Sequence, residues 1–244
     1  MLARAPFGAL ISGMREHFHR VIAIDGPAAS GKSSVARELA QQLGFVYVNS
    51  GAIYRAITWH ILQRKIHLEK NERIAGALQA TDIACCLQDN ESRILIDDVD
   101  PGEHLRDDCI NENVAGVSQF PVVRQIVADK LHELALSHDL IVEGRDIGSV
   151  VFPDTPYKFY LNASPEVRLQ RRIAQGGRDE IAIRDRVDSS RSVSPLVIAK
   201  DAPIGGLNYL DHPTPLSGQV SVQMKGGRGC RKIDPSLNFE GGAL

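Results

Sequence analysis

The stretch Gly26-Pro-Ala-Ala-Ser-Gly31-Lys32-Ser33-Ser34 matches the phosphate-loop pattern G-x-x-x-x-G-K-[ST] at every specified position. Before it, residues 21–25 (VIAID) form a β-branched run typical of a strand buried on both faces of a parallel sheet. After it, residues 32–43 repeat Val, Leu and Leu every fourth position, which indicates an amphipathic helix ending at Gly44. A glycine-rich turn alone would not need this setting, so the sequence predicts a phosphate-binding loop at residues 26–34.

The residue types of this loop suit ATP and Mg²⁺. Glycines let the backbone wrap closely, so that successive N–H groups point at phosphate oxygens. Lys32 offers a positive charge to the β- and γ-phosphates, and the Ser33 hydroxyl is a candidate Mg²⁺ ligand. We assign ATP binding to Gly26, Pro27, Ala28, Ala29, Ser30, Gly31, Lys32, Ser33 and Ser34.

Strands and helices alternate along most of the chain, which predicts a parallel sheet covered by helices on both faces, a three-layer α/β/α fold. Further strands are expected at residues 45–48, 140–142 and 157–161, and further helices after Asn49 or Ser50, at 122–136 and after Ser164. Residues 83–87 and 93–96 flank a turn-rich spacer and predict a small antiparallel hairpin within the α/β fold. Residues 1–20 are expected to form a disordered N-terminal extension; alternatively, Met1 is an upstream start and the true start lies near Met14.

The amino-acid composition argues against nucleic-acid and membrane partners. The 244-residue chain has a formal net charge of −2, which argues against a protein that coats nucleic acid. No apolar run reaches membrane-spanning length. The four cysteines, two of them adjacent at Cys85 and Cys86, have the spacing of neither a disulfide framework nor a zinc site. We therefore expect the protein to be located in the reducing cytoplasm, with its thiols free. We expect a monomer that acts on small molecules.

The rest of the sequence favours a small kinase. A GTPase would need D-x-x-G and N-K-x-D motifs, and the chain contains neither. Arg145 and Asp146 follow an expected strand, at the sheet edge where ligands bind in α/β folds. Arginines outnumber acids between Arg168 and Arg191, although a solvated helix could carry such a charge run. Arginine clusters of this kind are suited to gripping a phosphorylated acceptor.

Five segments in order resemble the bacterial cytidylate kinase family of nucleoside monophosphate kinases. They are IDGPAASGKSS, NSGAIYR, FPVVR at residues 120–124, EGRDIGSVVFPD at 143–154 and RDRVDSSRSVSPL at 184–196. The resemblance implies a P-loop kinase domain at residues 21–202, an acceptor-binding insert at about 65–120 and a short lid at about 168–191. It implies transfer of the γ-phosphate of Mg²⁺-ATP to CMP and dCMP.

The same resemblance implies roles for individual residues. Acceptor binding falls to Ser50, Tyr54, Arg55, Arg124, Arg145, Asp146, Arg184, Asp188 and Arg191. Among these, Arg55, Arg145 and Arg191 would hold the acceptor phosphate, and Arg184 and Asp188 the sugar. Arg124 would donate to cytosine O2 and N3, and Asp146 would accept from the exocyclic amine. The lid residues Arg168 and Arg172 would contact ATP, and Lys32, Arg145, Arg184 and Arg191 would carry catalysis.

The chain departs from the family pattern in three places. Ala115 stands where the family usually has a serine that contacts the base, the lid is short, and Pro203, Gly205 and Gly206 interrupt an expected strand. We therefore expect the tail at residues 203–244 to be irregular. Two alternatives stay open: a kinase for UMP or another small acceptor, and a nucleotide-binding protein with degraded catalysis.

Overall fold

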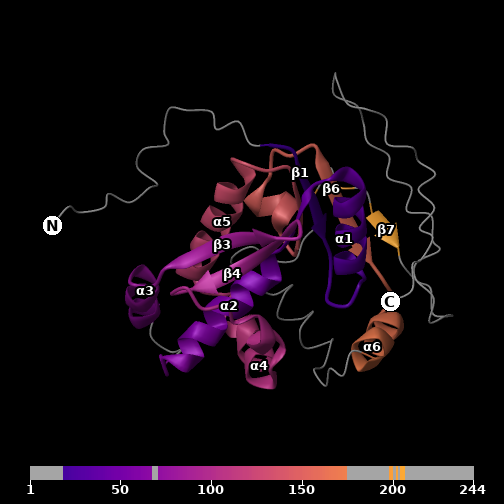
Figure 1. Cartoon of the computed structure of the whole chain (residues 1–244). Helices are drawn as coiled ribbons and strands as arrows, with labels where there is room; N and C mark the ends of the chain where they lie inside the picture. The colour runs from indigo at the N-terminus through magenta and orange to yellow at the C-terminus, as the bar shows by residue number, and fades with distance from the viewer. Residues whose placement is uncertain (1–18, 68–70, 175–197, 200–201, 203, 207–244) are drawn as a thin grey trace.

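The computed structural model describes residues 19–67, 71–174, 198–199, 202 and 204–206. Its centre is a seven-stranded sheet with the order β3-β4-β2-β5-β1-β6-β7 (Figure 1). Neighbouring strands pair in parallel except for the β3–β4 hairpin. The strands are β1 (Val21–Asp25), β2 (Val46–Asn49), β3 (Ile83–Gln88), β4 (Glu91–Ile96), β5 (Leu140–Gly144), β6 (Tyr157–Asn162) and β7 (Ile204–Gly206).

Helices cover both faces of this sheet, which confirms the predicted three-layer α/β fold (Figure 1). Alternating residues of β1 define the two cores: Val21 and Ala23 pack with side chains of α2 and α5, and Ile22 and Ile24 pack with those of α1. The helices are α1 (Lys32–Leu43), α2 (Ser50–Gln63), α3 (Asn71–Gln79), α4 (Asp108–Val117), α5 (Pro121–Ala135) and α6 (Pro165–Ala174). Two short helical segments, a 3₁₀ turn (Gly102–Arg106) and a π-helical turn (Ile147–Val151), complete the described elements.

Several helix and turn boundaries lie where the sequence predicted them. Gly44 ends α1 in the left-handed conformation, with its N–H bonded to Ala40 O, and the Asn49 side chain caps α2 by accepting from the Ala52 N–H. Asp89 and Asn90, both with positive φ, form the turn of the predicted hairpin. The hairpin joins the main sheet through Tyr47 and Glu91, so it extends one edge and does not form a separate sheet.

Two expectations about the chain ends need correction. Ile204–Gly206 pair in parallel with β6, so Pro203 and the two glycines do not prevent a short edge strand there. At the other end, the His19 N–H donates to Ala135 O at 2.9 Å, so ordered structure begins before residue 21. Residues 1–18 and 207–244 lie outside the described part of the chain. Within that part, no helix has the length and apolar character needed to cross a membrane.

Candidate active site

The phosphate loop begins with a glycine that no other residue can replace without a shift of backbone. Gly26 has φ of 148°, and a Cβ on it would lie 2.0 Å from the backbone oxygen of Leu161 on β6. Ala29 and Gly31 also have positive φ, 58° and 96°. Gly26 therefore lies tightly against β6, and positive φ angles of this kind are typical of loops whose N–H groups bind one anion.

The N-terminus of α1 follows the loop and is suited to an anion. Gly31 occupies the N-cap position and provides no side-chain cap, and the first turn contains no acidic residue. The N–H groups of this turn thus keep their capacity to bind phosphate oxygens.

Two cations lie over the phosphate loop. Lys32 is 5% exposed, and its Nζ donates to Pro27 O at 2.6 Å and to Ser30 Oγ at 3.3 Å. Arg168, at the start of α6, donates to Ala28 O at 3.3 Å and to Ala163 O at 3.2 Å. Arg168, which we predicted to belong to the lid, therefore contacts the backbone of the phosphate loop. Arg172 lies one turn further along α6 and is partly exposed.

Glu143, at the end of β5, is a site residue to which sequence reasoning assigned no role. Its carboxylate accepts from Ser33 Oγ at 3.0 Å and from the hydroxyl of Tyr47 on β2, and it is 4% exposed. Burial, followed by the negative charge of Glu143, raises the pKa of Tyr47 and keeps its phenol protonated. One sequence feature could have indicated this role: Glu143 is an acidic residue near the end of β5, and β5 pairs with β1, the strand that precedes the phosphate loop.

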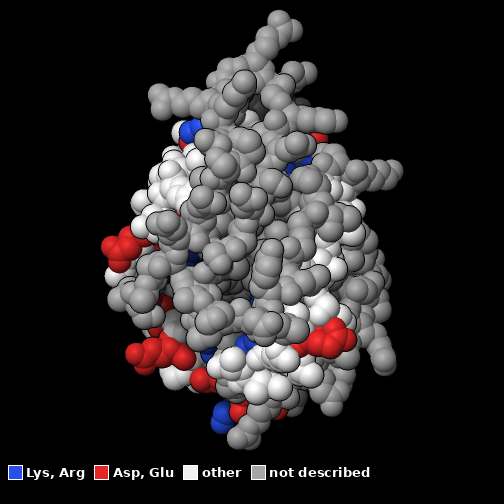
Figure 2. Space-filling view, turned by 90° about the vertical axis from the view of Figure 1, so that its right-hand side faces the viewer, with Lys and Arg blue, Asp and Glu red and all other residues white. Residues whose placement is uncertain are grey.

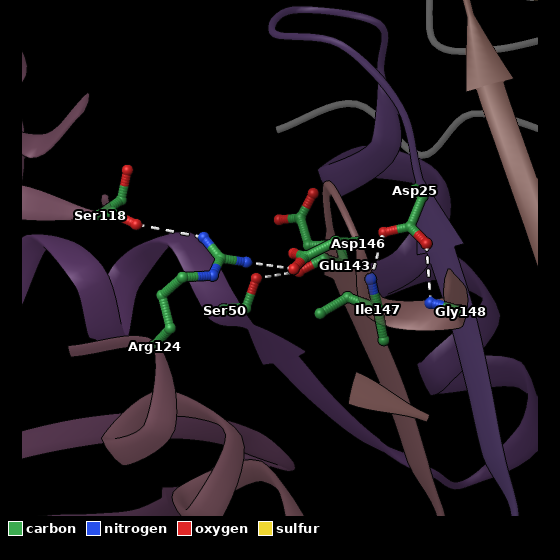
Figure 3. A network of polar contacts seen from close by, with 8 residues as sticks. All are labelled: Asp25, Ser50, Ser118, Arg124, Glu143, Asp146, Ile147 and Gly148. Carbon is green, nitrogen blue, oxygen red and sulfur yellow. Dashed lines mark hydrogen bonds and ion pairs between the residues drawn. The ribbon is translucent and has the colours of Figure 1, made fainter. Parts of the chain in front are cut away.

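On the acceptor side, a buried ion pair joins Arg124 of α5 to Asp146, just after β5 (Figure 3). Arg124 also donates to Ser118 O at 3.1 Å, and its guanidinium carbon lies 5.8 Å from the centre of the Tyr54 ring. Arg124 and Asp146 are only 8% and 4% exposed. Residues 22 positions apart are thus brought together, and their role in reading a base stays a prediction.

Ser50 connects this region to β5 through its side chain. Its Oγ donates to Glu143 O at 2.8 Å and is buried (Figure 3). A Cβ on Gly144 would lie 2.8 Å from this hydroxyl and 2.5 Å from Ile147 Cγ1, so the glycine permits the close approach. Ser50 therefore fixes the start of α2 against the end of β5, a positioning contact that the sequence alone did not predict.

The remaining predicted acceptor residues divide into two groups. Arg55 and Arg145 are partly exposed and donate to nearby backbone oxygens, Gly51 O at 3.3 Å and Gly144 O at 3.4 Å. They follow β2 and β5, two strands that pair directly, so both side chains start from one edge of the sheet. Arg184, Asp188 and Arg191 lie outside the described residues.

Asp25 is the last residue of β1 and directly precedes the phosphate loop, and its carboxylate points at the turn that follows Asp146 (Figure 3). Its carboxylate oxygens accept from the N–H groups of Ile147 at 2.9 Å and Gly148 at 2.8 Å. Burial raises its pKa to about 6; the two N–H groups and Lys32 oppose this shift, while the charge of Asp146 adds to it.

A phosphate loop after the first strand of a parallel sheet, with arginines at the neighbouring strand ends, defines a small P-loop kinase. The family model described as cytidylate kinase matches residues 22–206, and the chain therefore belongs to the cytidylate kinase family. The cytidylate kinase of Caldanaerobacter subterraneus is 43% identical over 192 residues, covering 74% of this chain and 84% of the relative. Those of Rhodococcus opacus and Oceanobacillus iheyensis are 40% and 38% identical, covering 75% and 74% of this chain and 85% and 84% of the relatives.

Proposed function

We propose that this protein transfers the γ-phosphoryl group of Mg²⁺-ATP to CMP and dCMP, giving ADP and CDP or dCDP. The observation that carries the choice of acceptor is the buried Arg124–Asp146 pair beside Tyr54. Family membership and the curated relatives named cytidylate kinase support the same reaction.

The pair has the hydrogen-bonding capacity that cytosine needs. Cytosine presents two acceptors, O2 and N3, beside the donor N4 amine; an arginine can donate to the first two and a carboxylate can accept from the third. Uracil carries a donor at N3, which would face the guanidinium and leave a buried donor without an acceptor. UMP is the second candidate acceptor, because Ala115 cannot provide the serine hydroxyl expected beside the base.

Donor binding is assigned to the phosphate loop. Its N–H groups and Lys32 would neutralise the β- and γ-phosphates, and Arg168 would support the loop through Ala28. Hydroxyl and carboxylate oxygens are the protein ligands that Mg²⁺ prefers, and Ser33 with Glu143 provides both, 3.0 Å apart. Mg²⁺ would be held by the Ser33 hydroxyl, with Glu143 orienting that hydroxyl, and when bound would neutralise charge on the phosphates.

The reaction requires positioning and charge neutralisation, without a covalent enzyme intermediate. A phosphate oxygen of CMP attacks the γ-phosphorus of ATP, the bond from that phosphorus to the β-phosphate oxygen breaks, and ADP leaves. Arg55 and Arg145 start from the edge of the sheet where the acceptor phosphate would lie, and we assign them to its binding. Arg184, Asp188 and Arg191 retain their proposed roles at the acceptor phosphate and sugar.

We further propose that the protein acts in the cytoplasm as a monomer on these small molecules, without nucleic acid or membrane partners. The described thiols Cys85, Cys86 and Cys109 are free, in keeping with a reducing compartment. Figure 2 shows one face of the molecule, on which both acidic and basic side chains of the described residues are visible. Light scattering during size exclusion should give the mass of one chain, and a dimer would refute this part.

The direct test is a coupled ADP-release assay with CMP, dCMP, UMP and AMP as acceptors. We expect turnover on CMP and dCMP, weaker turnover on UMP and none on AMP. Turnover on AMP without CMP would refute the acceptor assignment, and ATP binding without turnover on any acceptor would support a degraded nucleotide-binding protein. Arg64→Ala is a suitable control for arginine variants, because Arg64 pairs with Asp97 on the surface.

A further inference from the structure

We propose that Asp25 is a positioning residue for the acceptor: its carboxylate holds the turn that follows Arg145 and Asp146 in place beside the phosphate loop. Asp25 directly precedes Gly26, the first residue of that loop. Its two oxygens accept from the N–H groups of Ile147 at 2.9 Å and Gly148 at 2.8 Å. One side chain thus joins the ATP-binding segment to the acceptor-binding segment (Figure 3).

This contact leaves the side chain of Asp146 available to Arg124. Asp146 occupies the N-cap position of the π-helical turn Ile147–Val151, where an aspartate commonly accepts from the first N–H groups of its own turn. Here it makes no such bond, and its carboxylate pairs with Arg124. Asp25 satisfies the N–H groups in its place, from a strand more than a hundred positions earlier in the sequence.

Two bonds to consecutive N–H groups fix both the position and the direction of the turn. A single bond would restrain the direction of the turn, and with it the direction of Asp146, less than two bonds do. The register of β1 against β5 pairs Asp25 with Gly144, so the carboxylate meets the turn just beyond the end of its neighbouring strand. We infer that the precision of the Arg124–Asp146 pair depends on Asp25 through its bonds to Ile147 and Gly148.

Ionising Asp25 carries a cost in the fold, although its carboxylate satisfies two N–H groups there. Asp25 is 5% exposed, and burial raises the pKa of its carboxyl to about 6, so its ionised form is disfavoured in the fold. Groups that weaken a fold are retained most often where they serve a site. A carboxylate is the side chain that can accept two N–H groups at once with full charge.

The chain offers a matched control at the opposite ends of the same two strands. Asp139 precedes β5 and accepts from the Arg20 N–H, just before β1, at 2.8 Å. Asp139→Asn removes the same charge from a contact that joins the same strands, far from Arg145 and Asp146. It separates an effect on the β1–β5 pairing from an effect on the acceptor turn.

This inference rests on the proposed acceptor roles of Arg145 and Asp146, and the experiment compares Asp25→Asn, Asp139→Asn and Asp146→Asn in the full chain. The asparagine at position 25 keeps one acceptor oxygen and turns its amide NH2 group, a donor, toward the second N–H, so one bond is lost. We expect its KM for CMP to rise about tenfold and its preference for CMP over UMP to fall by a similar factor, for one lost charged hydrogen bond. The KM for ATP should change less than about twofold, and Asp139→Asn should leave both KM values unchanged.

Each outcome has a fixed meaning. Asp25→Asn with an unchanged KM for CMP, or with equal increases for CMP and ATP, overturns the proposal. Failure of Asp25→Asn to fold also overturns it, because the role would then be structural. Asp25→Glu keeps the charge but displaces the oxygens, and wild-type kinetics in that variant would contradict positioning. If Asp146→Asn leaves the preference for CMP over UMP unchanged, the proposed role of Asp146 in acceptor binding is wrong. If Asp146→Asn changes this preference and Asp25→Asn does not, only the positioning role of Asp25 is wrong.

Discussion

Replacing Arg124 by methionine removes the guanidinium from its buried ion pair with Asp146. Asp146 is 4% exposed, so its carboxylate is largely shielded from water. Removing one member of a buried pair costs about 3–5 kcal/mol, mostly from the uncompensated charge that remains. The same substitution also removes the hydrogen bond from Arg124 to Ser118 O. We therefore expect a large loss of stability in addition to a loss of acceptor binding.

Thermal and urea unfolding separate the two effects. For a domain of this size, 1 kcal/mol shifts the melting temperature by roughly 2–4 °C, so Arg124→Met should melt about 6–20 °C below wild type. The double variant Arg124→Met/Asp146→Asn removes both charges and should recover much of this loss. Its KM for CMP should stay at least about tenfold raised, because the base reader is still absent.

The surface pair Arg64–Asp97 provides the control. Its side chains are 58% and 38% exposed, and Arg64→Met should cost less than about 1 kcal/mol without any change in the KM for CMP. If Arg124→Met melted within about 2 °C of wild type and kept its KM for CMP, the pair would be neither a buried charge pair nor the base reader.

Three other predictions follow from the site. Lys32→Ala should lower kcat at least about a hundredfold in the ADP-release assay while circular dichroism stays native, and near-native turnover would contradict the phosphate-loop mechanism. Ala115→Ser should strengthen CMP binding by about 0.5–1.5 kcal/mol, measured by calorimetry, and an unchanged affinity would show that position 115 does not reach the base. The pKa of Asp25 is raised from 3.8 to about 6, so its ionisation should weaken the fold by up to about 3 kcal/mol as pH rises from 4 through 6. Urea unfolding of wild type should show this fall relative to Asp25→Asn, and parallel pH profiles would refute it.

The sequence predicted the elements whose signals are local. The phosphate loop, its preceding strand and its following helix are specified by adjacent residues, and Gly44 and Asn49 mark the next boundaries correctly. Helix α4 was missed because Asn111, Asn113 and Gly116 weaken its intrinsic helix propensity. Its buried residues Ile110, Val114 and Val117 nevertheless lie on one helical face, so tertiary packing determines its conformation.

The contacts between site residues could not be read from sequence spacing. Glu143 meets Ser33 and Tyr47 because β5 lies between β1 and β2, although it follows both by many positions in the chain. Strand order in a parallel sheet is set by how the crossover helices pack, and short sequence patterns do not encode it. The resemblance to a family supplied the pairing of Arg124 with Asp146, but it did not supply the contacts of Asp25 or Glu143.

Strand register links the hydrophobic core to the chemistry of the site. Asp25 pairs with Gly144 and Asn49 pairs with Glu143, so the loops that follow β1, β2 and β5 leave the sheet at one level. A shift of β1 by one residue would turn the Asp25 side chain to the opposite face and bury Ile22 and Ile24 against the wrong helices. The alternation of apolar side chains in β1 therefore determines both which core they fill and whether the ATP and acceptor segments meet.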